Sequence, residues 1–197
     1  MAHAPIPSNF KPVMVSFKPA SEVPSPGGAL KRFWPPFLLF FALPVAVALW
    51  FMGAFNGPRV AQAQRGPYDY AYLALSGDYS NLLAKQDEVY RALQAQGITP
   101  GAPVALLLKD PRSTPKRDLF SRAGFLVEPG VRLREPLRRG RIPPRRVVLV
   151  TVKANPYLAP GKAYKALLDY LQAHNMKLTL PTFEIYREGV LTVEMDT

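Results

Sequence analysis

The spacing of hydrophobic residues along residues 66–197 follows the order strand, helix, strand, strand, and this order occurs twice. The first predicted strand of each block is Tyr70–Ser76 or Arg146–Lys153, the latter an apolar β-branched run. An amphipathic helix follows in each block, because apolar side chains recur at helical spacing and form one stripe. The stripes consist of Leu82, Val89, Tyr90 and Leu93 in the first block, and of Tyr164, Leu167, Leu168 and Leu171 in the second.

Each block ends in two further strands. The predicted pairs are Pro103–Lys109 with Leu119–Val127, and Leu180–Arg187 with Val190–Met195. The second pair forms a hairpin that turns at Glu188-Gly189. Because two amphipathic helices can bury their stripes only against a sheet, we expect the helices on one face of the sheet and a cleft on its other face.

The two blocks align with a constant offset of 78 residues and no gap, as in Tyr79 with Tyr157. Gly97 matches Asn175, and these residue types most readily adopt the left-handed conformation that ends a helix. Further matches are Leu93-Gln94-Ala95 with Leu171-Gln172-Ala173, Pro103 with Pro181, Val89 with Leu167, Ile98 with Met176, and Leu107 with Ile185. We therefore predict an α+β domain at residues 66–197, with tandem strand-helix-strand-strand (SHS2) units at about 68–128 and 145–197, a pseudo-twofold antiparallel sheet and two helices.

Residues 33–55 form a run of 23 residues without a charge. A helix of this length, at about 1.5 Å per residue, reaches roughly 34 Å and would cross a hydrocarbon core of about 30 Å. We expect a single transmembrane helix here, with residues 1–32, which hold six prolines, as a disordered tail and residues 56–65 as a linker. A cleaved secretory signal peptide is the alternative, since Ala61-Gln62-Ala63 offers small residues at a suitable spacing.

Basic residues beside this run orient it only slightly. Lys18, Lys31 and Arg32 precede it, whereas Arg59 and Arg65 follow it. This balance favours a single-pass membrane protein with a cytoplasmic N-terminus, and leaves open which side of the membrane holds the domain.

The composition narrows the chemistry. The chain carries 25 Lys and Arg against 14 Asp and Glu, a net charge of +11, which favours an anionic neighbour. It has no Cys and two histidines, His3 and His174, which excludes disulfides and thiolate sites and leaves little for a zinc site. None of the nucleotide-binding, zinc-protease or nucleophile-elbow motifs occurs. We expect no metal, no cofactor and no catalysis.

The sharpest charge feature lies between the two units. Seven arginines fall within 15 residues and only Glu135 opposes them: Arg132, Arg134, Arg138, Arg139, Arg141, Arg145 and Arg146. The run would be a solvated loop or a contact with anionic lipid. Nucleic acid is less favoured, because no interleaved aromatic residues accompany the charges.

Four short segments carry a resemblance to a known family. Ser76-Gly77-Asp78-Tyr79 and Ala154-Asn155-Pro156-Tyr157 partly match a Gly-Pro-Tyr turn after a first strand. Lys109-Asp110-Pro111 is similar to a Tyr-Asp-x-Pro strand end, and Phe183-Glu184-Ile185-Tyr186 to a Phe-Glu-x-Tyr strand. With these segments in this order, the chain resembles, over about Gly66–Met195, the GyrI-like family, the effector-binding domain of some AraC-type and MerR-type regulators.

This resemblance implies a binding module in which a cleft between the two units takes an amphipathic or cationic small molecule. A carboxylate and aromatic side chains commonly line such a cleft. By strand alternation, Glu184 and Tyr186 would face the cleft if Phe183 and Ile185 meet the helix. The alternative for Glu184 is an ion pair with a nearby arginine or simple exposure to water.

Tyr70 and Tyr72 would add an aromatic wall by the same alternation, or pack without touching a ligand. A protein-interaction or scaffold domain, with its cleft filled by its own side chains, is a second function class. A hydrolase of strained small molecules, in which Glu184 or Glu194 assists water, is a third, although the cleft tryptophan of such enzymes is missing. Direct DNA binding is not expected, since the apolar run stands where such regulators carry their DNA-binding segment.

Overall fold

The computed structural model describes residues 40–197. The predicted tail and residues 33–39 of the predicted transmembrane helix lie outside the described residues. Residues 40–51 are helical. Within residues 40–197, none of the helices combines the length and the apolar character that crossing a membrane requires. The chain divides into the units Met1–Pro44 and Val45–Thr197, and the second contains the sheet.

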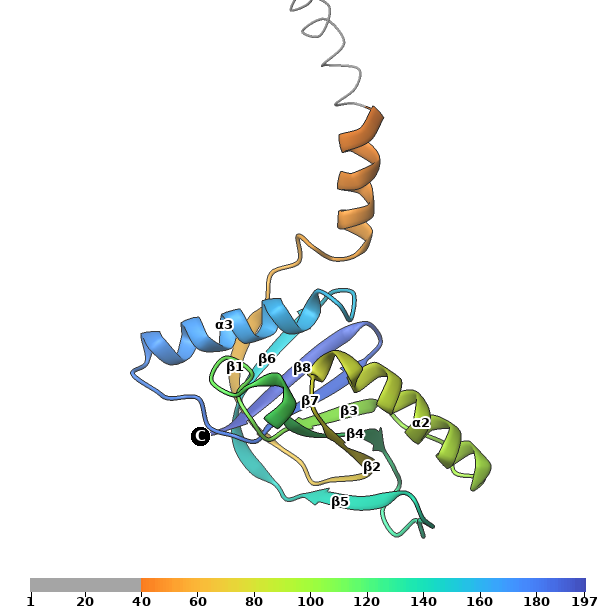
Figure 1. Ribbon diagram of the computed structural model, residues 1–197. Helices are drawn as coiled ribbons and strands as arrows, with labels where there is room; N and C mark the ends of the chain where they lie inside the picture. Colours follow the sequence, from red (N-terminus) through yellow and green to blue (C-terminus); the bar gives the residue numbers. More distant parts are fainter. Residues whose placement is uncertain (1–39) are drawn as a thin grey trace, which may run out of the picture. The chain divides into compact units, whose positions relative to one another are not determined.

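Eight antiparallel strands form one sheet in the order β1-β6-β8-β7-β3-β4-β2-β5 (Figure 1). The strands are β1 Arg59–Arg65, β2 Tyr68–Ser76, β3 Pro103–Leu107, β4 Phe120–Leu126, β5 Arg138–Ile142, β6 Arg145–Lys153, β7 Thr182–Arg187 and β8 Val190–Asp196. The helices are α2 Leu82–Ala95 and α3 Ala159–Ala173, with short 3₁₀ turns η1 Tyr79–Asn81 and η2 Lys116–Asp118.

The sheet is symmetrical about its central pair, β3 and β7. Outward from β3 come β4, β2 and β5, and outward from β7 come β8, β6 and β1. The two units are therefore β2-α2-β3-β4 and β6-α3-β7-β8. The predicted α+β class and the tandem strand-helix-strand-strand order are confirmed.

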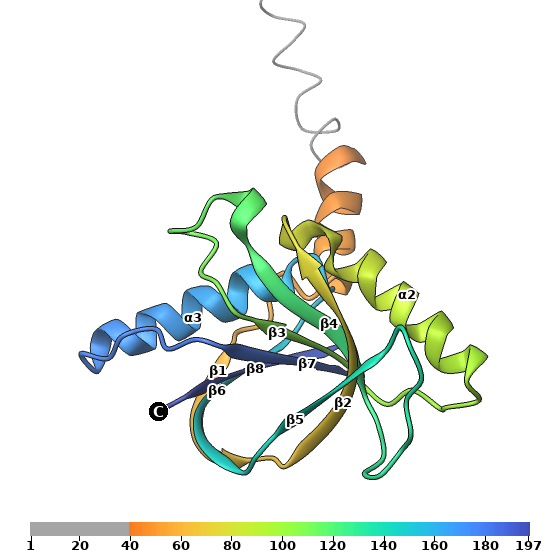
Figure 2. The same cartoon turned by 60° about the horizontal axis from the view of Figure 1, so that its bottom comes forward.

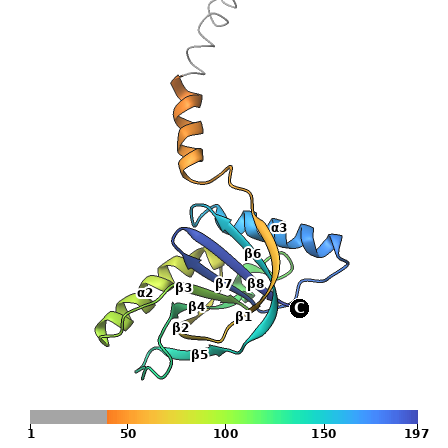
Figure 3. The same cartoon turned by 180° about the vertical axis from the view of Figure 1, so that it is seen from behind.

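Two strands lie where the sequence predicts none. The expected linker contains β1, and the arginine run, expected as a loop, contains β5. Each is an edge strand that crosses to the other unit: β1 precedes β2 but pairs with β6, and β5 precedes β6 but pairs with β2 (Figure 3). Because an edge strand has one neighbour and stays largely exposed, these segments need no apolar alternation, and the pattern misses them.

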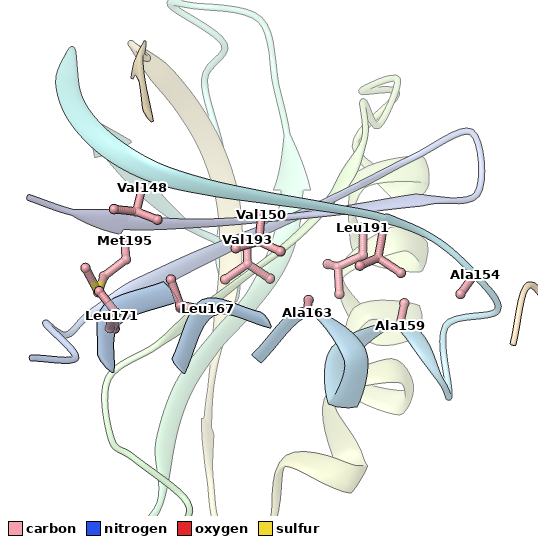
Figure 4. Packing of buried hydrophobic residues seen from close by; sticks show 11 residues of the cluster. Val148, Val150, Ala154, Ala159, Ala163, Leu167, Leu171, Leu191, Val193 and Met195 are labelled. Atoms are coloured by element: carbon pink, nitrogen blue, oxygen red, sulfur yellow. The ribbon is translucent and has the colours of Figure 1, made fainter. Parts of the chain in front are cut away.

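The helix α3 packs on its own half of the sheet. Its buried residues Ala159, Ala163, Leu167 and Leu171 recur every four residues and form one stripe. In Figure 4 this stripe faces the valines of β6 and the apolar side chains of β8, which include Val148, Val150, Leu191, Val193 and Met195. The second unit thus has a dry core of its own.

The helix α2 covers the other half in the same way. Val89 and Leu93 are fully buried against Ala71 of β2 and Val127, which follows β4. Both helices end as predicted, because Gly97 and Asn175 have φ angles of 70° and 54°, in the left-handed region. The tight turn at Glu188-Gly189 is also confirmed, with positive φ at both residues.

A third core lies on the opposite face of the sheet. Tyr70, Val104, Leu106, Ile142, Phe183 and Ile185 form it. Gly140 pairs with Tyr70 across the strands, and a Cβ at Gly140 would lie 2.1 Å from Cζ of the Tyr70 ring. The missing side chain at Gly140 therefore makes room for the buried ring.

Candidate functional site

The middle of the helix-covered face is open. One row of cross-strand neighbours runs over this face: Val150, Val193, Glu184, Ala105, Ala123 and Leu73. The first two pack under α3 and Leu73 packs under α2. Glu184 and Ala105 lie between the helices, which cover opposite halves of the sheet in Figure 2, and line a cavity of about 450 Å³.

The cavity corrects the expected position of the cleft. The sequence analysis places it on the face opposite the helices, whereas it opens on the same face, between them. The reason is that each helix covers only the strands of its own unit and leaves the central pair β3 and β7 bare. The opposite face is closed by the core around Tyr70 and Phe183, which are 1% and 0% exposed.

The walls of the cavity follow the internal repeat. Equivalent positions of the two units, 78 residues apart, line it from both sides: Tyr79 and Tyr157, Leu82 and Pro160, Leu83 and Gly161, and Gln86 and Tyr164. The tyrosine pair comes from the two turns that carry the family resemblance. The repeat in the sequence therefore pointed to these wall residues, although the analysis did not name Tyr79 or Tyr157 as site residues.

The offset changes to 79 in the floor of the cavity. Ala105 and Glu184 face each other in the β3–β7 pair, and Leu107 and Tyr186 occupy equivalent places beside them. The connection from α3 to β7 spans 174–181, one residue longer than the connection 96–102 from α2 to β3. The predicted match of Leu107 with Ile185 is therefore wrong, since Leu107 lines the cavity and Ile185 packs on the opposite face.

Glu184 is the charged group at the floor. Its side chain is buried, with 4% of the residue exposed, and burial raises the pKa of its carboxyl to about 7. The neighbouring Tyr164 hydroxyl opposes this rise, and it also lies 2.7 Å from Oγ1 of Thr182. Within residues 40–197 no Lys, Arg or His forms an ion pair with Glu184. Pairing with an arginine and exposure to water are both wrong as explanations of this residue.

Aromatic rings surround the carboxyl. Tyr186, two residues along β7, lines the cavity as predicted, and burial raises the pKa of its hydroxyl. Burial also raises the pKa of Tyr164 well above its ordinary value, with the Glu184 carboxylate adding to the rise. Both hydroxyls stay neutral near pH 7, so Glu184 carries the negative charge in this part of the cavity.

Glu184 and Tyr186 face the cleft for a different reason from the one expected. Phe183 and Ile185 do not meet a helix but join the core on the opposite face. Strand alternation then sends Glu184 to the helix-covered face, where the gap between the helices leaves it beneath the cavity.

Tyr70 and Tyr72 lie outside the cavity lining. Tyr70 is buried in the core on the opposite face, where its ring lies 5.7 Å from that of Phe183 and its hydroxyl accepts a hydrogen bond of 3.3 Å from Arg122. The Tyr72 ring carries the Arg122 guanidinium 4.8 Å from its centroid. Both rings therefore pack within the fold rather than form a cavity wall.

A loop present only in the first unit closes one side of the cavity. Lys109, Asp110, Pro111 and Arg112 of residues 108–119 line it, whereas the second unit has the two-residue turn at Glu188-Gly189. The Tyr79 hydroxyl holds this loop by donating to the carbonyl oxygens of Lys109 and Phe120, at 2.8 and 3.0 Å. The Asp110 and Arg112 side chains pair with each other, at 2.7 Å.

Glu194 belongs to a different place. It is fully buried, and its carboxylate accepts hydrogen bonds from Arg65, Tyr68 and Arg145 at 2.8, 2.9 and 3.1 Å. Arg145 also pairs with Asp196. These contacts join β1, β6 and β8, so Glu194 stabilises the crossed edge strand and lies outside the cavity lining.

The arginine run is divided by the fold. Arg145 belongs to the ion-pair network, whereas the exposed residues are Arg132, Arg134, Arg138, Arg139, Arg141 and Arg146. Arg139 donates to the carbonyl oxygen of Val131. His174 caps the end of α3, where its Nδ1 lies 2.8 Å from the Tyr170 carbonyl oxygen. Within the described part of the chain, no group of three or more His, Asp or Glu is placed to hold a metal.

No family model and no curated protein matches the chain, but solved structures share its fold. EcmrR in a complex with DNA superposes with a TM-score of 0.60 at 12% identity, over 85% of this chain and 68% of that chain. The C-terminal domain of EcmrR gives 0.56 at 16% identity, over 71% and 96%. SAV2435 bound to tetraphenylphosphonium gives 0.51 at 8% identity, over 70% and 93%. These likenesses support the GyrI-like fold.

Proposed function

We propose that the chain binds an amphipathic organic cation in the cavity between α2 and α3, with Glu184 as its counter-ion. The observation that carries the proposal is a buried carboxyl with no ion pair in residues 40–197, at the floor of an open cavity. A buried charge is costly unless it is paired, and a bound cation would supply the missing charge. The rings of Tyr164 and Tyr186 would add cation–π attraction.

The cavity favours a small ligand over a scaffold role. Its volume of about 450 Å³ lies within the range of pockets that take drug-sized molecules. A scaffold domain would fill this space with its own side chains. SAV2435, which has the same fold, was solved with tetraphenylphosphonium, an amphipathic cation, and this supports the ligand class. We propose binding without catalysis, because no second acid, base or nucleophile accompanies Glu184 in the motifs of the sequence.

Filling the cavity is expected to abolish binding. A Cβ at Gly161 meets no atom within 4 Å, so Gly161→Leu adds its side chain at the cavity wall without a clash. We expect tetraphenylphosphonium to bind the full-length chain in a non-ionic detergent, and Gly161→Leu to raise its Kd at least about tenfold by steric exclusion. Isothermal titration calorimetry, with protein-free micelles as blank, measures both.

Gly57→Leu is the matched control, since Gly57 also has no atom within 4 Å of a Cβ and lies outside the cavity lining. Its Kd should equal that of the unmodified chain. Equal binding by all three proteins would place the ligand elsewhere, and no binding by the unmodified chain would refute the proposed ligand class.

We further propose that residues 33–55 attach the chain to a membrane, with the exposed arginines as a second contact to anionic lipid. In support, residues 40–51 are helical and the side chains of Phe40, Phe41, Trp50 and Phe51 are 63–86% exposed. The full-length chain should float with phosphatidylcholine vesicles and resist extraction by alkaline carbonate. Addition of phosphatidylserine should increase flotation, less so for Arg138→Gln/Arg141→Gln. A chain that stays in the soluble fraction with every vesicle would overturn this proposal.

A further inference from the structure

The segment that precedes the domain is bonded to the wall of the cavity. The helix of residues 40–51 ends in a Schellman motif, in which Gly53 N–H donates to the Trp50 carbonyl and Ala54 N–H to the Leu49 carbonyl, both at 3.0 Å. Gly53 has a φ of 72°, and a Cβ there would lie 2.6 Å from the Lys153 carbonyl oxygen. The end of this helix therefore lies directly against the end of β6.

Lys162 of α3 binds the carbonyl groups that follow this helix. Its ammonium group donates to the carbonyl oxygens of Gly53, Ala54 and Asn56, at 3.2, 2.6 and 2.5 Å. An ammonium has three N–H donors, so all of them are used. A helix C-terminus leaves carbonyl groups unpaired and carries partial negative charge, which makes it a favourable place for a lysine.

Two further bonds hold the segment to the turn between β6 and α3. The Asn155 N–H donates to the Met52 carbonyl at 2.9 Å, and Asn56 Nδ2 donates to the Lys153 carbonyl at 2.6 Å. Five hydrogen bonds thus join residues 52–56 to residues 153–162.

The same turn and helix form one wall of the ligand cavity. Pro156 and Tyr157 follow Asn155 directly, and Pro160, Gly161 and Tyr164 flank Lys162 along α3. A ligand that contacts these side chains restrains the turn and the first two turns of α3. Because the backbone of residues 52–56 is bonded to these elements, its fluctuations decrease as well.

We propose that Lys162 couples occupancy of the cavity to the segment of residues 49–56, so that a bound ligand tightens the attachment of the preceding helix to the domain. This inference rests on the proposed function, since it uses the same cavity. Lys162 is a positioning residue, because it lies outside the cavity lining and acts through α3.

Hydrogen exchange of the full-length chain, in a non-ionic detergent with and without tetraphenylphosphonium, tests the coupling. Saturating ligand should slow exchange of the amides of residues 53–56 about fivefold, a typical size for coupling between sites. Lys162→Met should remove this slowing and, because coupling is reciprocal, raise the Kd of the ligand by a similar factor. Asn56→Ala, which removes one of the five bonds, should give a smaller effect of the same sign.

Lys165→Met is the matched control, since Lys165 lies on the same helix and pairs only with Asp169, at 2.7 Å. It should keep the slowing in full. Ligand binding without any change in residues 53–56, or the same slowing in Lys162→Met, would overturn the coupling and leave the proposed function standing. Absence of binding to the unmodified chain would instead refute both.

Discussion

Glu184→Gln is expected to raise the Kd for tetraphenylphosphonium about 30-fold at pH 8, which corresponds to roughly 2 kcal/mol. The substitution keeps the size of the side chain and removes its charge, so the cation loses its counter-ion in a buried site. The pKa of Glu184 is raised to about 7, and the cation binds the ionised form. Affinity of the unmodified chain should therefore rise about tenfold between pH 6 and pH 8 and level off above.

Other groups near Glu184 do not titrate in this range in a way that would hide the effect. The pKa values of Tyr79, Tyr164 and Tyr186 are raised above their ordinary value near 10, and Lys109 and Arg112 are the cations of the lining. The affinity of Glu184→Gln should accordingly stay constant with pH. Calorimetric titration at both pH values measures this.

Glu128→Gln is the control variant, because Glu128 is exposed and remote from the cavity lining. Tetraphenylborate, an anion of the same shape, is the control ligand and should not bind the unmodified chain at pH 8. Equal affinity for the cation in Glu184→Gln and the unmodified chain would show that the carboxylate is not the counter-ion.

The second large effect is on the pH dependence of stability without ligand. Burial raises the pKa of Glu184 from 4.5 to about 7, so between these values the folded state binds more protons than the unfolded state. The stabilisation from this group is complete below pH 4.5 and is lost as the pH rises through 7. Between pH 5 and pH 8 the free energy of unfolding should fall by roughly 2 to 3 kcal/mol through Glu184.

Urea denaturation of the unmodified chain and of Glu184→Gln at pH 5 and pH 8 measures this loss. The variant should lack it, and should be the more stable protein at pH 8. Saturating tetraphenylphosphonium should restore stability to the unmodified chain at pH 8, since it binds the folded state. Identical pH profiles for the two proteins would mean that the carboxyl is not desolvated in the apo fold.

The local patterns in the sequence predicted much of the fold. The helical stripes, the left-handed helix ends at Gly97 and Asn175 and the turn at Glu188-Gly189 depend on residues close in the chain, and all were found. The alternation along β7 placed Glu184 and Tyr186 on one face. These features depend on short-range periodicity and on backbone conformations that few residue types adopt, which a sequence shows directly.

The choice of neighbours across the sheet was beyond the sequence. The edge strands β1 and β5 exchange between the units, and their segments have no apolar alternation because each has one pairing partner and a largely exposed surface. The single extra residue in 174–181, which reverses the match of Leu107 with Ile185, is equally invisible in an ungapped alignment.

The sequence by itself thus determined a repeated strand-helix-strand-strand unit and the residue that carries charge on β7. Only the tertiary structure decided which face holds the cavity, because that depends on how far each helix reaches over a sheet assembled from distant segments. It also decided that Tyr70 fills a core while Tyr79 and Tyr157 form walls. Burial of a tyrosine is set by what packs against it from elsewhere in the chain, and no local pattern records that.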